Sequence, residues 1–164
     1  MQPMTESAIR RSFINASRSE TAALHLPQDL ESIDWENLDQ LGWRDYKMPK
    51  RGYLLAPFEG SVVGVLLRAP DTAPPRNRRV LCALCEDIFS EDEVFLFVAK
   101  RAGAPGRNGN TVGTLIHSDF TCSRNVRAEV KPTAIHPDPD VVVKSRIEGL
   151  QARTEKFIRQ VLNQ

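Results

Sequence analysis

The chain has 164 residues, a length that favours one compact domain because roughly 70% of the unfolded surface can be buried at this size. Its composition, 41% hydrophobic and 26% charged, is that of a soluble globular protein, and no apolar run is long enough to span a bilayer. The 22 basic and 21 acidic residues leave a formal net charge of only +1, which excludes a strong overall attraction to nucleic acid or to anionic lipid.

The segment from Met1 to Phe13 is interrupted by charged and hydroxyl side chains, whereas a secretory signal needs a continuous apolar stretch. We therefore expect a cytoplasmic protein without disulfide bonds, because cytosolic thiols are kept reduced. The chain has three cysteines, an odd number that cannot pair completely. Metal binding is then the leading use for them.

Helical spacing of apolar residues predicts three short helices before residue 45. The first begins near Thr5, and the second covers residues 19–26. The third covers residues 29–41 and ends before Gly42, since glycine is favoured just past a helix C-terminus. We expect these helices to cover one face of a sheet.

The sheet itself is predicted to begin with an antiparallel hairpin. Residues 53–58 and 61–68 are apolar and flank Glu59 and Gly60, a two-residue connection of the hairpin type. Residues 69–75 follow and are rich in proline, which cannot donate the hydrogen bonds of a regular ladder. We place the internal boundary of the chain in this connector.

Two further strands are predicted, one in the β-rich run 93–99 and one at residues 114–116. A glycine-rich loop, residues 103–113, joins them. Glycine lets a backbone approach a partner closely, so the loop is either a plain connection or a contact made through Arg107 and Asn108.

The last part of the chain changes from irregular to helical. A short helix after Cys122 would carry Arg124 and Arg127, either as a rigid platform for an acidic surface or phosphate or as a solvated face. Residues 131–140 contain three prolines and are expected to be an irregular linker. Residues 141–162 form an amphipathic helix whose apolar stripe needs a surface to pack on.

Four side chains form a candidate metal site. Cys82 and Cys85 have the C-x-x-C spacing that directs two thiolates at one ion, and His117 and Cys122 offer a second pair. Three thiolates and one imidazole make a closed tetrahedral site, which is the structural rather than the catalytic pattern. Alternatives are a redox dithiol at the first pair, three inert buried cysteines, or Asp119 or a water in place of the histidine.

Several segments combine into a wider pattern: residues 82–85, 96–103, 109–113 and 119–127, together with 12–17, 34–35 and 38–45 upstream. This combination resembles the C-terminal treble-clef zinc finger of the elongation factor G-binding family, which includes the FusB-type fusidic acid resistance proteins. The likeness spans most of residues 9–130. The resemblance implies a treble clef with one ligand pair on a zinc knuckle and the other at the end of a hairpin and the start of a helix.

The resemblance also implies a ligand set and a function. Cys82, Cys85 and Cys122 correspond to zinc ligands of the family, and His117 stands where the family usually has a fourth cysteine. The implied function is to bind translation elongation factor G and promote its departure from the ribosome, which in some members rescues translation stalled by fusidic acid. Resistance proteins of the family carry a helical bundle before the finger, for which this chain has little room, so the resemblance leaves open whether the chain confers antibiotic resistance.

The sequence thus predicts an α+β protein, with an antiparallel sheet, a treble-clef zinc finger, short N-terminal helices and a C-terminal amphipathic helix. Its expected divisions are residues 1–75 with the helices and first hairpin, 76–131 with the finger, and 132–164 with the linker and last helix. We expect a monomeric, non-enzymatic protein that holds one structural Zn²⁺, binds elongation factor G and does not bind membranes. The expected partner-binding residues are Arg101, Arg107, Asn108, Arg124 and Arg127.

One alternative function and one excluded function complete the prediction. The same zinc module could instead bind ribosomal RNA or another nucleic acid directly through its arginines, and the salt dependence of RNA affinity would separate the two. A zinc hydrolase would require an open coordination position and a carboxylate base nearby, and it is not expected.

Overall fold

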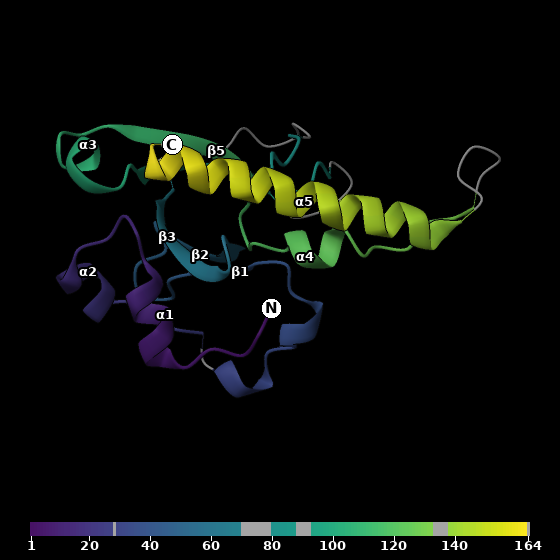
Figure 1. Ribbon diagram of the computed structural model, residues 1–164, viewed down its shortest axis with the longest axis horizontal. Helices are drawn as coiled ribbons and strands as arrows, with labels where there is room; N and C mark the ends of the chain where they lie inside the picture. The colour runs from purple at the N-terminus through teal and green to yellow at the C-terminus, as the bar shows by residue number, and fades with distance from the viewer. Residues whose placement is uncertain (28, 70–79, 88–92, 133–137, 164) are drawn as a thin grey trace.

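The computed structural model describes residues 1–27, 29–69, 80–87, 93–132 and 138–163. A five-stranded sheet in the order β1-β2-β3-β4-β5, with every neighbouring pair antiparallel, forms its centre. Short N-terminal helices lie on one side of this sheet and one long helix lies on the other (Figure 1). The strands are β1 (Leu41–Arg44), β2 (Arg51–Phe58), β3 (Ser61–Arg68), β4 (Val94–Lys100) and β5 (Thr111–His117).

The helices are short except for the last. They are α1 (Glu6–Ser12), α2 (Arg18–Ala22), α3 (Gly103–Arg107), α4 (Cys122–Asn125) and α5 (Pro139–Leu162), with 3₁₀ turns η1 (Leu30–Ser32) and η2 (Trp35–Asn37). Side chains define the starts of three of them. Thr5 accepts a hydrogen bond from the third residue beyond it, Ser17 and Glu20 form a capping box, and Asp138 caps α5. Among the described helices, none combines the length and apolarity that crossing a bilayer requires.

The first predicted hairpin is confirmed. β2 and β3 pair over eight residue pairs, and Glu59 and Gly60 connect them with φ values of 47° and 79°. Two positive φ angles in succession give the turn whose twist matches that of the flanking strands. β4 and β5 form a second hairpin of seven pairs, whereas the described residues of β3 and β4 share two pairs, Leu67↔Ala99 and Arg68↔Val98.

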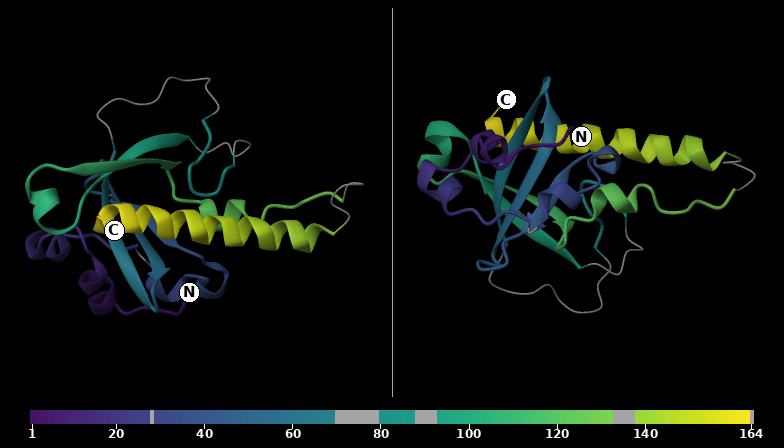
Figure 2. Two further views of the ribbon diagram at one scale, coloured as in Figure 1. Left: turned by 45° about the horizontal axis from the view of Figure 1, so that its top comes forward. Right: turned by 90° about the horizontal axis from the view of Figure 1, so that it is seen from below.

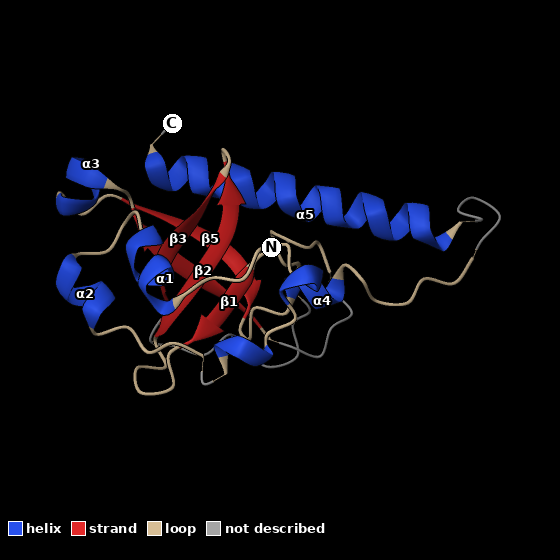
Figure 3. Ribbon diagram, turned by 60° about the horizontal axis from the view of Figure 1, so that its bottom comes forward, coloured by secondary structure: helices blue, strands red, loops and turns tan. Residues whose placement is uncertain are grey.

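Each face of the sheet has its own core, because successive side chains of a strand point to opposite faces. On β2, Leu54 and Ala56 belong to the cluster that includes α5 and the cysteines. Tyr53 on the same strand belongs to the other cluster, with Ile9 of α1 and the two tryptophans. The expectation that the short helices cover one face is therefore confirmed (Figures 1 and 3).

Helix α5 packs across the sheet through the predicted stripe. Leu150, Phe157, Ile158 and Val161 are buried against the first core cluster. The N-terminal part of α5 extends beyond the sheet in every view (Figures 1 and 2), and Val141 there is 62% exposed.

One predicted helix is wrong, and one loop is more ordered than predicted. Residues 29–41 contain only η1 and η2, and Gly42 belongs to β1 instead of ending a helix. The physical reason is long-range packing, because a Cβ on Gly42 would lie 2.5 Å from Phe120. The loop predicted at 103–113 begins with α3. Most of the connector at 69–75, the boundary at 75/76 and the middle of the 131–140 linker lie outside the described residues.

Candidate metal centre

Three cysteine sulfurs converge beneath the end of the second hairpin. The Sγ atoms of Cys82, Cys85 and Cys122 all lie within 4.8 Å of one another, and the Cys82 and Cys122 sulfurs are 3.7 Å apart. Four ligands around Zn²⁺ at a Zn–S distance of about 2.3 Å place neighbouring sulfurs about 3.8 Å apart. A disulfide needs about 2.05 Å, and all three cysteines are free. The donor set and its spacing therefore fit a tetrahedral metal ion.

The first cysteine pair lies on a tight turn. The amide of Glu86 donates to the carbonyl of Cys82 at 2.9 Å, and Glu86 has a φ of 57°, which closes the turn. The amide of Ala83 donates to the carbonyl of Leu115 on β5 at 2.7 Å. This bond fixes the knuckle to the strand that ends at His117.

The second pair spans a reversal between strand and helix. His117 is the last residue of β5, and Cys122 is the first residue of α4. Between them, Phe120 adopts a φ of 57° and its amide donates to the carbonyl of His117 at 3.0 Å. A knuckle, a hairpin end and the first turn of a helix are the three positions from which a treble clef holds its metal.

His117 lies beside the sulfurs but outside their closest grouping. It is 1% exposed, it interacts with the thiols of Cys82 and Cys85, and its Nε2 is 4.0 Å from Oδ2 of Asp87. Burial lowers the pKa of this imidazole, but the two neighbouring sulfurs outweigh burial and raise the pKa to about 10. The raised pKa reflects how close this imidazole lies to the two sulfurs.

The sulfurs also change one another's pKa values. Hydrogen bonds from Cys122 and Cys85 lower the pKa of Cys82 well below the usual thiol range. Hydrogen bonds of Cys122 with Cys82 and Cys85, together with burial, raise the pKa of Cys122. A buried group of thiols that stabilises thiolate charge is suited to a soft divalent cation, which binds the deprotonated sulfur.

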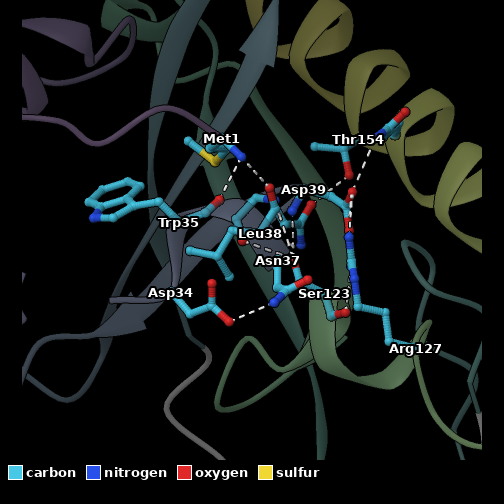
Figure 4. A network of polar contacts seen from close by, with 11 residues as sticks. Met1, Asp34, Trp35, Asn37, Leu38, Asp39, Ser123, Arg127 and Thr154 are labelled. Atoms are coloured by element: carbon cyan, nitrogen blue, oxygen red, sulfur yellow. Dashed lines mark hydrogen bonds and ion pairs between the residues drawn. The ribbon is translucent and has the colours of Figure 1, made fainter. Parts of the chain in front are cut away.

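A polar network supports the helix that carries Cys122 (Figure 4). Its centre is the hydroxyl of Ser123, which accepts hydrogen bonds from the amides of Asp39 and Gln40 at 3.2 Å each and donates to the Gln40 carbonyl at 3.0 Å. Thr154 of α5 donates to the side chain of Gln40 at 2.6 Å. One side chain next to a cysteine therefore joins α4 to the segment before β1 and, through it, to α5.

Arg127, predicted to bind a partner, is part of the same network. Its guanidinium lies 2.5 Å from the carboxylate of Asp39 and donates to the Ser123 carbonyl at 2.9 Å. The side-chain amide of Gln151 donates to the same carboxylate at 3.1 Å. The carboxylate is nearly buried. These contacts attach Arg127 to the segment before β1.

The other predicted partner residues fall into two groups. Arg107 and Asn108 are exposed at α3, and Arg124 is exposed on α4. The seven residues of β5 separate α3 from α4 by roughly 20 Å at about 3.3 Å per residue, and the two helices lie apart in Figure 1. Arg101 donates to the carbonyl of Gln160 and to the side chain of Asn163. The structure does not bring the five residues together on one patch.

Sequence patterns assigned no role to Asp39, Gln40 or Ser123. The available signal was local and weak, namely two polar residues between apolar Leu38 and Leu41, and a serine directly after a candidate ligand. The two polar residues are 8% and 1% exposed, so their burial could have been inferred only from their partners more than 80 residues away.

Comparison with known proteins gave one match. A family model described as the FBP C-terminal treble-clef zinc-finger matches residues 8–161. The match therefore includes the sheet, the cysteine cluster and nearly all of α5. No curated protein and no solved structure matches the chain.

Proposed function

We propose that this chain, which belongs to the FBP C-terminal treble-clef zinc-finger family, is a non-enzymatic zinc protein that binds translation elongation factor G. The observation that supports this most directly is the buried group of three sulfurs, contributed by a knuckle and by the helix that follows a hairpin. Members of the family are elongation factor G-binding proteins, and the match extends over almost the whole chain.

The proposed metal is one Zn²⁺ held by Cys82, Cys85, His117 and Cys122. Three thiolates and an imidazole close the coordination sphere, so no position remains for a reacting water. The role of the ion is then structural. It joins the knuckle, the end of β5 and the start of α4.

The partner surface is proposed to include exposed arginines near the finger. Arg107 and Arg124 offer guanidinium groups for charge-assisted hydrogen bonds to carboxylates of the factor. Arg127 is a poor choice for testing this contact, because reversing its charge would also disrupt the ion pair with Asp39. The informative variants are Arg107→Glu and Arg124→Glu, measured separately.

Binding to purified elongation factor G tests the proposal. Zinc-loaded protein is titrated with the factor, and the metal-free protein serves as the control. We expect saturable binding by the zinc-loaded form, weaker binding by each charge-reversed variant, and a lower yield of factor on ribosomes after addition of the protein. Absence of any binding, together with RNA affinity that falls steeply with rising salt, would instead support a module that binds ribosomal RNA.

A further inference from the structure

We propose that a groove centred on Lys100 binds an acidic segment of the protein partner, whose carboxylates pair with Lys100 and Arg107. A cavity of about 450 Å³ lies between the α1–α2 turn and α3, and Lys100 and Arg107 line it. A smaller hollow of about 140 Å³, lined by Val98 and Thr111 among others, shares Asn15 and Lys100 with the cavity. The two hollows therefore meet at Lys100 and form one groove.

One wall of the groove is fixed by Asn15. Its side-chain amide donates to the carbonyls of Leu66 at 2.9 Å and Lys100 at 3.0 Å, and its oxygen accepts from the amide of Leu66 at 2.8 Å. The amide of Ile14 adds a bond to the carbonyl of Gly64 at 3.0 Å. The α1–α2 turn is thereby attached to two strands, so this wall is in place before a partner arrives.

The opposite wall, formed by α3, is attached to the end of α5. The amide of Ala102 donates to the carbonyl of Val161 at 2.7 Å. The guanidinium of Arg101 donates to Gln160 and to Asn163 at 3.2 Å, in the last turn of α5 and just beyond it. Arg101 lines the cavity, but it acts as a positioning residue because its charged group is directed at α5.

The charges of the groove leave a positive excess. Glu20 is the carboxylate that lines it, and this group is already occupied by Arg68 at 3.3 Å and by the amide of Ser17 at 2.9 Å. Within the described part of the chain, the side chains of Lys100 and Arg107 make no hydrogen bond, and the charge of Lys100 interacts with that of Glu20. Two cations beside a single carboxylate that Arg68 already pairs leave this preformed cavity suited to further carboxylates.

Beyond Lys100 the groove continues onto an apolar surface. Leu96 and Val98 lie on the same face of β4 as Lys100, because side chains two residues apart share a face. Leu96 is directly opposite Leu115 on β5, and the two are 49% and 36% exposed. A nucleic acid backbone would require a longer series of cations. Two cations followed by leucines fit a short segment in which acidic and apolar residues alternate.

The partner's identity rests on the proposed function, but the groove can be tested without it. The probe is a synthetic peptide, Glu-Leu-Glu-Leu-Glu-Glu, added to the zinc-loaded protein while the amide signals of Gly103, Gly106 and the Asn15 side chain are followed by NMR. The test variant is Lys100→Glu with Arg107→Glu. The matched control is Lys144→Glu with Arg146→Glu, which makes the same charge change at two exposed positions of α5.

We expect the peptide to shift the groove signals and to bind the test variant at least about tenfold more weakly than the wild type, with the control variant within about twofold of it. Zinc content and thermal midpoint should be the same in all three proteins. An equal loss in both variants would show attraction to net charge alone and would overturn the proposal. Displacement of the peptide by low concentrations of polyuridylate or inorganic phosphate would overturn it as well.

Titration with elongation factor G separates the two proposals. If the wild type binds the peptide in the groove but does not bind the factor, the groove stands and the proposed function fails. If the factor binds the wild type and the Lys100→Glu, Arg107→Glu variant equally, the function stands and the groove is not the docking site.

Discussion

Gly42 of β1 lies directly against Phe120, the turn residue between His117 and Cys122. A Cβ on Gly42 would be 2.5 Å from Cβ of Phe120, and one on Gly52 of β2 would be 2.6 Å from its Cζ. Real Cβ atoms do not approach other carbons this closely. Two glycines on adjacent strands thus leave space for one aromatic ring, and this contact connects β1 and β2 with the turn between His117 and Cys122.

Gly42→Ala should destabilise the zinc-loaded protein by about 1–3 kcal/mol, because an overpacked core forces side chains or backbone to move. The atom it would meet is the Cβ of Phe120, which cannot swing away. Chemical denaturation measures the change. Gly113→Ala in β5 is the control, since its nearest neighbour is the side-chain end of the half-exposed Leu96, and alanine is favoured over glycine inside a strand by about 0.5–1 kcal/mol. Equal effects of the two substitutions would contradict the packing argument.

Cys122→Ser should abolish zinc retention and loosen residues 80–130. Structural zinc contributes on the order of 10 kcal/mol, which is comparable with the whole stability of a domain. Elemental analysis gives the metal content, and hydrogen exchange locates the loosening. Removing the metal from the wild type with a chelator should reproduce the effect. A variant with unchanged metal content and thermal midpoint would refute the site.

His117→Cys distinguishes a ligand from a buried neighbour. If His117 is the fourth ligand, a cysteine at this position supplies another sulfur and zinc should be retained, whereas His117→Ala should release zinc at lower chelator concentration. Replacing zinc with cobalt gives a near-ultraviolet charge-transfer band whose intensity reports the number of sulfur ligands. Identical spectra for the wild type and His117→Cys would exclude the histidine as a ligand or show that the new sulfur stays outside the site.

Ser123→Ala should destabilise the protein by about 1–3 kcal/mol, because it leaves the buried amides of Asp39 and Gln40 without their acceptor. Thermal unfolding of the zinc-loaded form measures the loss. Ser61→Ala is a suitable comparison, since that hydroxyl is exposed at a hairpin turn and donates only to the Phe58 carbonyl. A change at Ser61 below about 0.5 kcal/mol is expected. Similar losses at both serines would argue against the network.

Asp45 should make stability depend on pH. Burial raises its pKa, but hydrogen bonds from His25, Tyr53 and two amides outweigh burial and lower the pKa from 3.8 to about 2. A carboxyl whose pKa is lower in the folded state stabilises the protein above the unfolded pKa, and the contribution of about 2 kcal/mol is lost as pH falls through 3.8 toward 2.

The comparison of wild type with Asp45→Asn isolates this contribution from acid release of zinc, which affects both proteins. The difference in unfolding free energy between them should be constant above about pH 5 and should shrink as the pH approaches 2. Tyr53 remains protonated throughout, because burial and the Asp45 charge raise its pKa. A difference that does not change with pH would show that Asp45 is not the titrating group.

The features that could be predicted from the sequence are those with local causes. The connection Glu59–Gly60 predicts its hairpin because the turn itself requires positive φ angles. The stripe on α5 repeats at helical spacing, and Cys82 and Cys85 are adjacent on one turn. These patterns depend on near neighbours, and the structure confirms the hairpin, the helix and the grouping of the three cysteines.

The features that could not be predicted depend on distant contacts. The sequence predicts that Gly42 ends a helix, but in the structure its missing side chain leaves space for the ring of Phe120. Arg127 has the appearance of a binding residue, but its partner Asp39 lies 88 positions earlier. The predicted helix at 29–41 does not form at its C-terminal end, because the backbone amides of Asp39 and Gln40 donate to the hydroxyl of Ser123 and not to carbonyls four residues earlier. The two members of each pair lie too far apart in the sequence for a local pattern to reveal their contact.

The short backbone pairing between β3 and β4 has a consequence for the order in which the chain folds. Among the described residues, two pairs join β3 to β4, against eight and seven within the hairpins, so we expect each hairpin to form from its own mostly local contacts. Refolding should therefore proceed in two kinetic phases, a fast one that does not depend on metal concentration and a slower one that does. In the slower phase, the part of the chain with β4, β5 and the cysteines would dock on the N-terminal helices and β1–β3, which have already folded.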